Sequence, residues 1–127
     1  MTGIDGCLAE AMTIPGARGA SLVDWTSGLS LAAAGTGPGI DHETAAVEAA
    51  ELARTAVEGR AFTRGGAGED IVEELILTAR GGYHLIRFVE TGFDSSVLLY
   101  LWLDRAEANL AVALFRLKDL TTRLVLA

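Results

Sequence analysis

The order in which helical and strand periodicities follow one another restricts most strongly how this chain of 127 residues can fold. The first segment, 3–14, predicts a helix, because Ile4, Cys7, Leu8 and Ala11 recur at helical spacing, and Pro15-Gly16 ends it. Segments 19–25 and 29–34 then predict two strands joined by a tight turn. An alanine-rich helix, three more strands and a last helix complete the order.

The middle helix is predicted over 42–58. Asp41 is placed as its N-cap, Glu43 in its first turn complements the helix dipole, and Gly59 follows its last residue. Glycine-rich connectors are expected over 35–39, before this helix, and over 64–69, after it.

The second half of the chain predicts strands over 70–78, 83–90 and 97–103, with a hairpin loop over 79–82 and a turn over 91–96. The segment 97–103 is apolar on both faces, as expected of a central strand that is covered on two sides. A last helix is expected over 105–124, with Asp104 as its cap.

Strands that turn back through short loops form antiparallel sheets, so the predicted fold class is α+β. Five strands form an antiparallel sheet that is sandwiched between helices, in the order α-β-β-α-β-β-β-α. The length suits one domain over 1–127 with a single proper core.

Composition excludes several classes of protein. The net charge of −7 argues against a nucleic-acid partner, whose phosphates require a basic surface. The longest apolar run, 97–103, has seven residues, whereas a membrane helix needs roughly 20, so no membrane insertion is expected. No signal peptide is visible, and the single cysteine, Cys7, fits a reducing compartment. These observations together predict a cytoplasmic protein.

Residue types that commonly act in catalysis or bind metal ions are scarce in this sequence. His42, His84 and Cys7 fall in three different predicted elements, so they give no zinc-site spacing. The connector over 35–39 lacks the lysine of a phosphate-binding loop, and no GxSxG motif is present. The sequence therefore predicts a protein that is not an enzyme, with no catalytic residues, no cofactor and no metal site.

The apolar arc of the middle helix is unusually wide, at about 160° of its circumference. It is wider than packing on one sheet requires, and the mean hydropathy of +0.36 is high for a small soluble monomer. We therefore expect a homodimer. Its interface is predicted at Ala46, Ala49, Ala50, Ala53, Val57, Ile71 and Val72. On charge grounds, Glu48, Glu51 and Glu58 on the opposite side of the helix are predicted to bind a partner.

Two stretches carry a family resemblance. In Ile14-Pro15-Gly16-Ala17-Arg18-Gly19-Ala20-Ser21-Leu22-Val23-Asp24, a glycine step is followed by a strand that ends in an acid. Ser27-Gly28-Leu29-Ser30-Leu31-Ala32-Ala33-Ala34-Gly35 is similar to a second strand, although Ser27 or Thr26 replaces the usual aspartate. With the element order, these stretches resemble the roadblock family, the dynein light chain-like domain also found in bacteria.

The resemblance implies a profilin-like architecture, with the middle helix on one face of the sheet and the terminal helices on the other. It also implies a homodimer in which the middle helix and the following strand meet their copies. Bacterial members of the family often regulate small Ras-like GTPases without catalytic residues of their own. The expected function is a non-enzymatic regulatory or scaffold protein that binds such a GTPase or another signalling partner.

A second interpretation belongs to another class: a small-ligand-sensing module of PAS-like or profilin-like construction. It rests on four aromatic residues that either line a pocket or belong to the ordinary core. These residues are Trp25, Phe88, Tyr100 and Trp102.

Overall fold

The computed structural model describes residues 3–62, 71–89 and 96–124. Within them the predicted order of elements is confirmed. The elements are α1 (Ile4–Ala11), β1 (Ala17–Asp24), β2 (Leu29–Gly35), α2 (His42–Glu58), β3 (Glu74–Thr78), β4 (Gly82–Phe88), β5 (Val97–Asp104) and α3 (Leu110–Arg123). The expected connector over 64–69, the first residue of the expected strand over 70–78, and most of the expected turn over 91–96 lie outside the described residues.

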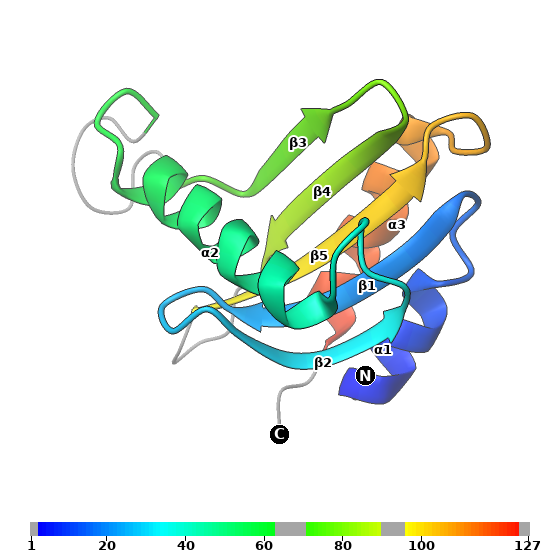
Figure 1. Ribbon diagram of the computed structural model, residues 1–127, viewed down its shortest axis with the longest axis horizontal. Helices are drawn as coiled ribbons and strands as arrows, with labels where there is room; N and C mark the ends of the chain where they lie inside the picture. The colour runs from blue at the N-terminus through cyan, green and yellow to red at the C-terminus, as the bar shows by residue number, and fades with distance from the viewer. Residues whose placement is uncertain (1–2, 63–70, 90–95, 125–127) are drawn as a thin grey trace.

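The five strands form one antiparallel sheet in the order β2-β1-β5-β4-β3, which leaves β2 and β3 as its two edges. Figure 1 shows α2 crossing one face of the sheet, with α1 and α3 behind the other face. This is the predicted sandwich. The middle helix and the terminal helices lie on opposite sides.

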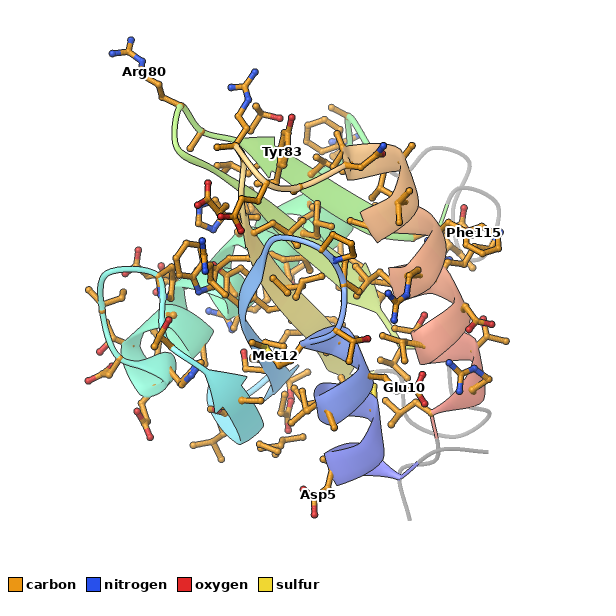
Figure 2. The ribbon with its side chains drawn as sticks, turned by 90° about the vertical axis from the view of Figure 1, so that its right-hand side faces the viewer. Asp5, Glu10, Met12, Arg80, Tyr83 and Phe115 are labelled. Carbon is orange, nitrogen blue, oxygen red and sulfur yellow. The ribbon has the colours of Figure 1, made fainter. Side chains whose placement is uncertain are left out.

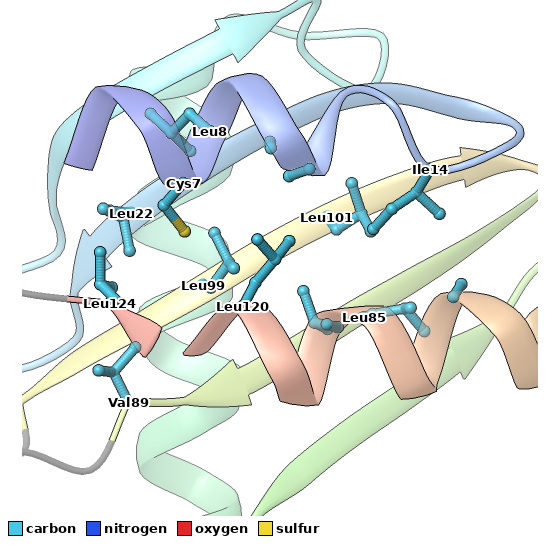
Figure 3. Packing of buried hydrophobic residues seen from close by; sticks show 14 of the residues in the cluster. Cys7, Leu8, Ile14, Leu22, Leu85, Val89, Leu99, Leu101, Leu120 and Leu124 are labelled. Carbon is cyan, nitrogen blue, oxygen red and sulfur yellow. The ribbon is translucent and has the colours of Figure 1, made fainter. Parts of the chain in front are cut away.

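The central strand β5 joins the two halves of the core because its side chains alternate between the faces. Leu99, Leu101 and Leu103 point to the side of α1 and α3, where they pack with Cys7 and other fully buried residues (Figure 3). Leu98 and Tyr100 point to the side of α2. The prediction that this strand is covered on both faces is therefore confirmed.

Polar contacts join α1 and the residues just after it to α3, which lies beside α1 in Figure 2. Arg123 of α3 forms an ion pair with Glu10 of α1 at 2.8 Å, and Arg116 donates to the hydroxyl of Thr13 at 2.6 Å. Because these groups are partly exposed, each pair adds little to stability, and the apolar contact beneath them holds the layer together.

Two predicted boundaries were wrong. The last helix begins at Leu110 and is capped by Asn109, whose side chain accepts from the backbone N–H of Val112. Asp104 instead ends β5, where it accepts from Arg18 and from the backbone N–H of Ala106. The third strand begins only at Glu74.

Candidate functional site

A groove lies beside α2, on the face of the sheet that this helix covers. α2 packs chiefly on β1 and β2, so the half of the face formed by β3 and β4 is left open. The cavity has a volume of about 390 Å³. Its lining residues come from five segments: Pro38, Ile40, Ala45, Glu48, Ala49, Leu52, Leu75, Leu77, His84, Ile86 and Tyr100.

Local sequence explains how α2 and the sheet form this groove. Asp41 caps α2 by accepting from the backbone N–H of Thr44 at 2.7 Å, as predicted. Ala46, Ala50 and Ala53 then face the sheet and are almost completely buried against Val23, Leu98 and their neighbours. Because an alanine side chain is one methyl group, the helix lies close to the sheet there and does not extend over β3.

The floor of the groove is set by the β3–β4 register. Leu75 lies opposite Ile86, and Leu77 lies opposite His84. Residues paired directly across an antiparallel ladder share one face, so these four side chains all point toward the groove. Most of the floor is therefore apolar, with one imidazole among the aliphatic groups.

The polar groups of the groove are His84, Tyr100 and Glu48. The Nδ1 atom of His84 lies 2.7 Å from the hydroxyl of Tyr100, and the imidazole stacks on the rings of Tyr100 and Trp102. Burial lowers the pKa of His84. Burial, with a smaller effect of the Glu48 carboxylate, raises the pKa of Tyr100. At neutral pH the hydrogen bond thus joins two neutral groups, and its direction depends on the tautomer of His84.

This burial predicts a pH dependence of stability. The folded state binds a proton at His84 more weakly than the unfolded chain, whose imidazole has the ordinary pKa of 6.5. We therefore expect the free energy of unfolding to fall as the pH drops from about 7.5 to about 5, with a smaller fall in a His84→Gln variant. Urea unfolding of both proteins at several pH values measures the difference. If the free energy of unfolding falls equally with pH in both proteins, His84 contributes nothing to this pH dependence.

The predicted interface residues divide into two groups. Ala46, Ala49, Ala50 and Ala53 are buried inside the chain, where α2 meets the chain's own sheet. Their methyl groups are not on the surface, so most of the wide apolar arc packs against the chain's own residues. Val57 and Val72 are half-buried, and Ile71 is exposed. Ile71 and Val72 precede β3 and are not part of it, which corrects their placement in the strand.

The predicted partner-binding residues, Glu48, Glu51 and Glu58, are all exposed on α2, as the helical projection indicates. Of the three, Glu48 also lines the groove. The sequence analysis did not identify Ile40 and Leu77 as site residues, and it did not assign His84 to a site; all three line the groove. The alternation of Leu75 and Leu77 in an edge strand was the signal available for part of this site.

Of the aromatic residues of the ligand-binding interpretation, Tyr100 is buried, whereas Trp25, Phe88 and Trp102 are partly buried and pack against the same core cluster. The rings of Trp25 and Phe88 meet edge to face at 6.0 Å. The indole Nε1 of Trp102 donates to the carbonyl of Thr36 at 2.8 Å. Of the four aromatic residues, only Tyr100 lines the groove.

Among residues 3–62, 71–89 and 96–124, no group of three or more His, Cys, Asp or Glu side chains is arranged to hold a metal ion. Across the same residues, no helix is both long and apolar enough to cross a lipid bilayer.

Comparison with solved structures identifies the fold. No protein-family model and no curated protein sequence matches the chain. MglB of Myxococcus xanthus superposes with a TM-score of 0.74 at 18% identity, over 91% of this chain and 80% of that one. The gliding protein MglB of Thermus thermophilus gives 0.69 at 23%, over 91% and 80%. A Roadblock/LC7 domain from Streptomyces avermitilis gives 0.67 at 20% identity, over 95% of this chain and 93% of that one. The predicted resemblance is confirmed at the level of the fold: this chain has a roadblock/LC7-like fold.

Proposed function

We propose that this chain is a single roadblock-like domain over 1–127 that acts as a non-enzymatic, homodimeric regulatory or scaffold protein of the cytoplasm. Its partner is a small Ras-like GTPase or another signalling protein. The observation that carries the proposal is the open apolar groove between α2 and the edge strand β3. A groove of this kind, next to a strand that pairs with β4 alone among the described strands, suits a second copy of the chain.

Three exposed apolar side chains surround the groove and support self-association. Ile40 is 43% exposed, Leu52 41% and Leu77 46%. They come from the loop before α2, from α2 itself and from β3. A second copy would cover them and pair with the outer side of β3. The proposed interface thus combines these residues with Val57, Ile71 and Val72. One similar structure is described as MglB with a tetrameric arrangement, so self-association occurs in a protein of this fold.

The substitution Leu52→Glu tests the dimer. Leu52 is exposed in the single chain, so the variant should fold normally. In the dimer it would bury an unpaired carboxylate, which costs several kcal/mol and should raise the dissociation constant at least about a hundredfold. Sedimentation equilibrium at micromolar concentrations measures this constant. Val112→Glu on α3, which is also exposed and lies away from the groove, is the matched control. A wild-type protein that sediments as a monomer contradicts the proposal.

The partner site is proposed at Glu48, Glu51 and Glu58, which present acidic charge on α2; Glu48 also lines the groove and would therefore border both the second copy and the partner. We expect a GTPase or signalling partner with basic groups to associate more slowly with a variant in which all three are glutamine, and the difference should shrink as salt screens the charges. Association rates with a candidate partner at low and high salt measure this. Equal rates at low salt would exclude these residues as the recognition site.

A second candidate function rests on the size of the groove. Small-molecule pockets span about 300–1,000 Å³, and the volume of about 390 Å³ lies in this range. An apolar molecule that hydrogen-bonds to His84 would fit the chemistry of the lining. A native mass spectrum separates the two functions. A clean dimer mass supports self-association, and a retained small-molecule adduct supports ligand sensing.

A further inference from the structure

The strand β2 forms one edge of the sheet, and β3 forms the other edge (Figure 1). Among the described strands β2 pairs with β1 alone. Its residues alternate between exposed and half-buried along the whole strand. Ala32 and Ala34 pack toward the core beneath α1 and α3, whereas Leu31 and Leu29 are 48% and 62% exposed.

Edge strands of soluble proteins are usually protected by charged residues, by proline or by a covering element. The strand β2 contains no charged residue and no proline, and the uncharged stretch extends from Thr26 to Ile40. Its register with β1 shifts once, between the pairs Leu22–Ala32 and Val23–Ser30, so that Leu31 lies at a bulge. The edge strand β3 differs from β2 in its charge. Its Glu74 forms an ion pair with Arg87, and Glu73 lies beside the same guanidinium. β2 is also the longer edge, with seven residues against five.

A third exposed apolar side chain lies beside the start of β2. A Cβ atom at Gly28 would be 3.8 Å from Val47 of α2, so this valine is adjacent to the turn that leads into the strand. Val47 is also exposed, at 48%. Leu29, Leu31 and Val47 therefore present apolar contacts along this edge, and at its two ends the N–H of Leu29 donates to the hydroxyl of Ser27 and the carbonyl of Gly35 contacts Nε2 of His42.

Acidic groups flank the edge at both ends. Asp24 lies opposite Leu29 in the β1–β2 register. At the other end, the Nε2 atom of His42 is 3.0 Å from the carbonyl of Gly35, which places Asp41 and Glu43 nearby. Hydrogen bonds from Thr26 and Thr44 lower the pKa values of Asp24 and Asp41, so both carboxylates are charged at neutral pH.

We infer that β2 is a docking edge for an extended segment of a partner protein. The segment joins the sheet as an additional strand, with apolar residues at alternate positions and a basic residue at each end. Main-chain hydrogen bonds to the edge supply affinity, and the side chains facing Leu29, Leu31 and Val47 supply selectivity. Seven residues of strand span about 23 Å, which sets the length of the segment.

The charges at the two ends of β2 favour an extended segment with basic ends over a second copy of the chain. An antiparallel pair of β2 strands would bring Asp24 of one copy toward Asp41 and Glu43 of the other, which places like charges together. The homodimer proposed above uses β3, at the opposite edge. Docking at β2 is therefore compatible with that dimer and does not depend on it.

The test uses the peptide acetyl-Lys-Val-Thr-Val-Thr-Val-Lys-amide and the isotopically labelled full chain. We expect saturable shifts of the backbone amide signals of 29–35, with a dissociation constant below about 1 mM that rises with salt. The same peptide with glutamate at both ends should bind more weakly. Leu31→Lys should weaken binding about tenfold through lost apolar contact and added repulsion. Phe115→Lys, which places the same charge on exposed α3, should leave binding unchanged.

Thermal unfolding of both variants verifies that they are folded. The inference is overturned if no saturable shift occurs at 29–35, if the shifts map to β3, or if the two variants weaken binding equally. It is also overturned if Leu31→Lys changes the sedimenting mass and not peptide binding, since β2 would then pair with a second copy. Leu52→Glu, which tests the dimer, leaves this edge intact, so failure of one proposal is distinguishable from failure of the other.

Discussion

Replacing Ala53 by glutamate should unfold the chain, whether or not it forms a dimer. The side chain of Ala53 is fully buried, in a cluster that contains Val23, Leu98 and Ala50. A glutamate there introduces a longer side chain into a filled space and places a carboxylate among apolar atoms. Overpacking alone costs about 1–3 kcal/mol, and the buried charge adds several more. Because a domain is stable by only about 5–15 kcal/mol, most of the helical circular dichroism signal should be lost at 37 °C.

Thr55→Glu is the matched control for this substitution. Thr55 lies on the same helix but is exposed, and its hydroxyl donates to the carbonyl of Glu51 in its own helix at 3.0 Å. The control should change stability by less than about 0.5 kcal/mol. If Ala53→Glu instead folds with wild-type stability and sediments as a monomer, the alanine faces a second copy, and the packing of α2 described above is incorrect.

The alanine face of α2 shows what hydrophobic periodicity can predict and what it cannot. The spacing of the alanines identified a buried face correctly, and Asp41 and Gly59 fixed both ends of the helix. Periodicity does not tell what covers a face. A row of methyl groups suits a second helix and a flat sheet equally well, and the structure places the chain's own sheet against it. The predicted interface therefore included residues that are already buried in a single copy.

The start of the last helix illustrates a limit of a different kind. Both Asp104 and Asn109 have side chains that suit an N-cap, and the residues between them are compatible with a helix. The choice depends on a contact distant in sequence, because Arg18 of β1 pairs with Asp104 at 3.0 Å and holds it at the end of β5. Asn109 is then the residue that caps α3. Local sequence does not contain this information.

The groove was the part of the molecule least accessible to sequence reasoning. Its lining comes from five segments, and its position depends on where α2 crosses the sheet. The alternation of Leu75 and Leu77 predicts a face of β3 but not whether a helix covers it. The fold, in contrast, followed from features that each element shows by itself, such as the fully apolar strand that became β5.

Because β5 is buried on both faces, we expect two neighbouring leucines of this strand to contribute equally to the free energy of unfolding. Leu98 packs on the side of α2 and Leu99 on the side of α1 and α3, and both are fully buried. Truncation to alanine removes apolar contacts and leaves a cavity, which costs about 2–5 kcal/mol at each site. In a sheet covered on one face only, one of the two substitutions would be nearly neutral. We expect similar losses for Leu98→Ala and Leu99→Ala in urea unfolding.

The double variant extends this prediction. Because the two side chains lie on opposite faces of the sheet and belong to different clusters, their effects should add to about 4–10 kcal/mol, enough to unfold many domains of this size. Leu29→Ala, at an exposed position on β2, should cost less than about 1 kcal/mol and is the control. A loss below about 1 kcal/mol for either Leu98→Ala or Leu99→Ala would mean that the corresponding face of β5 is not covered in solution, because an uncovered leucine loses little packing when it is truncated.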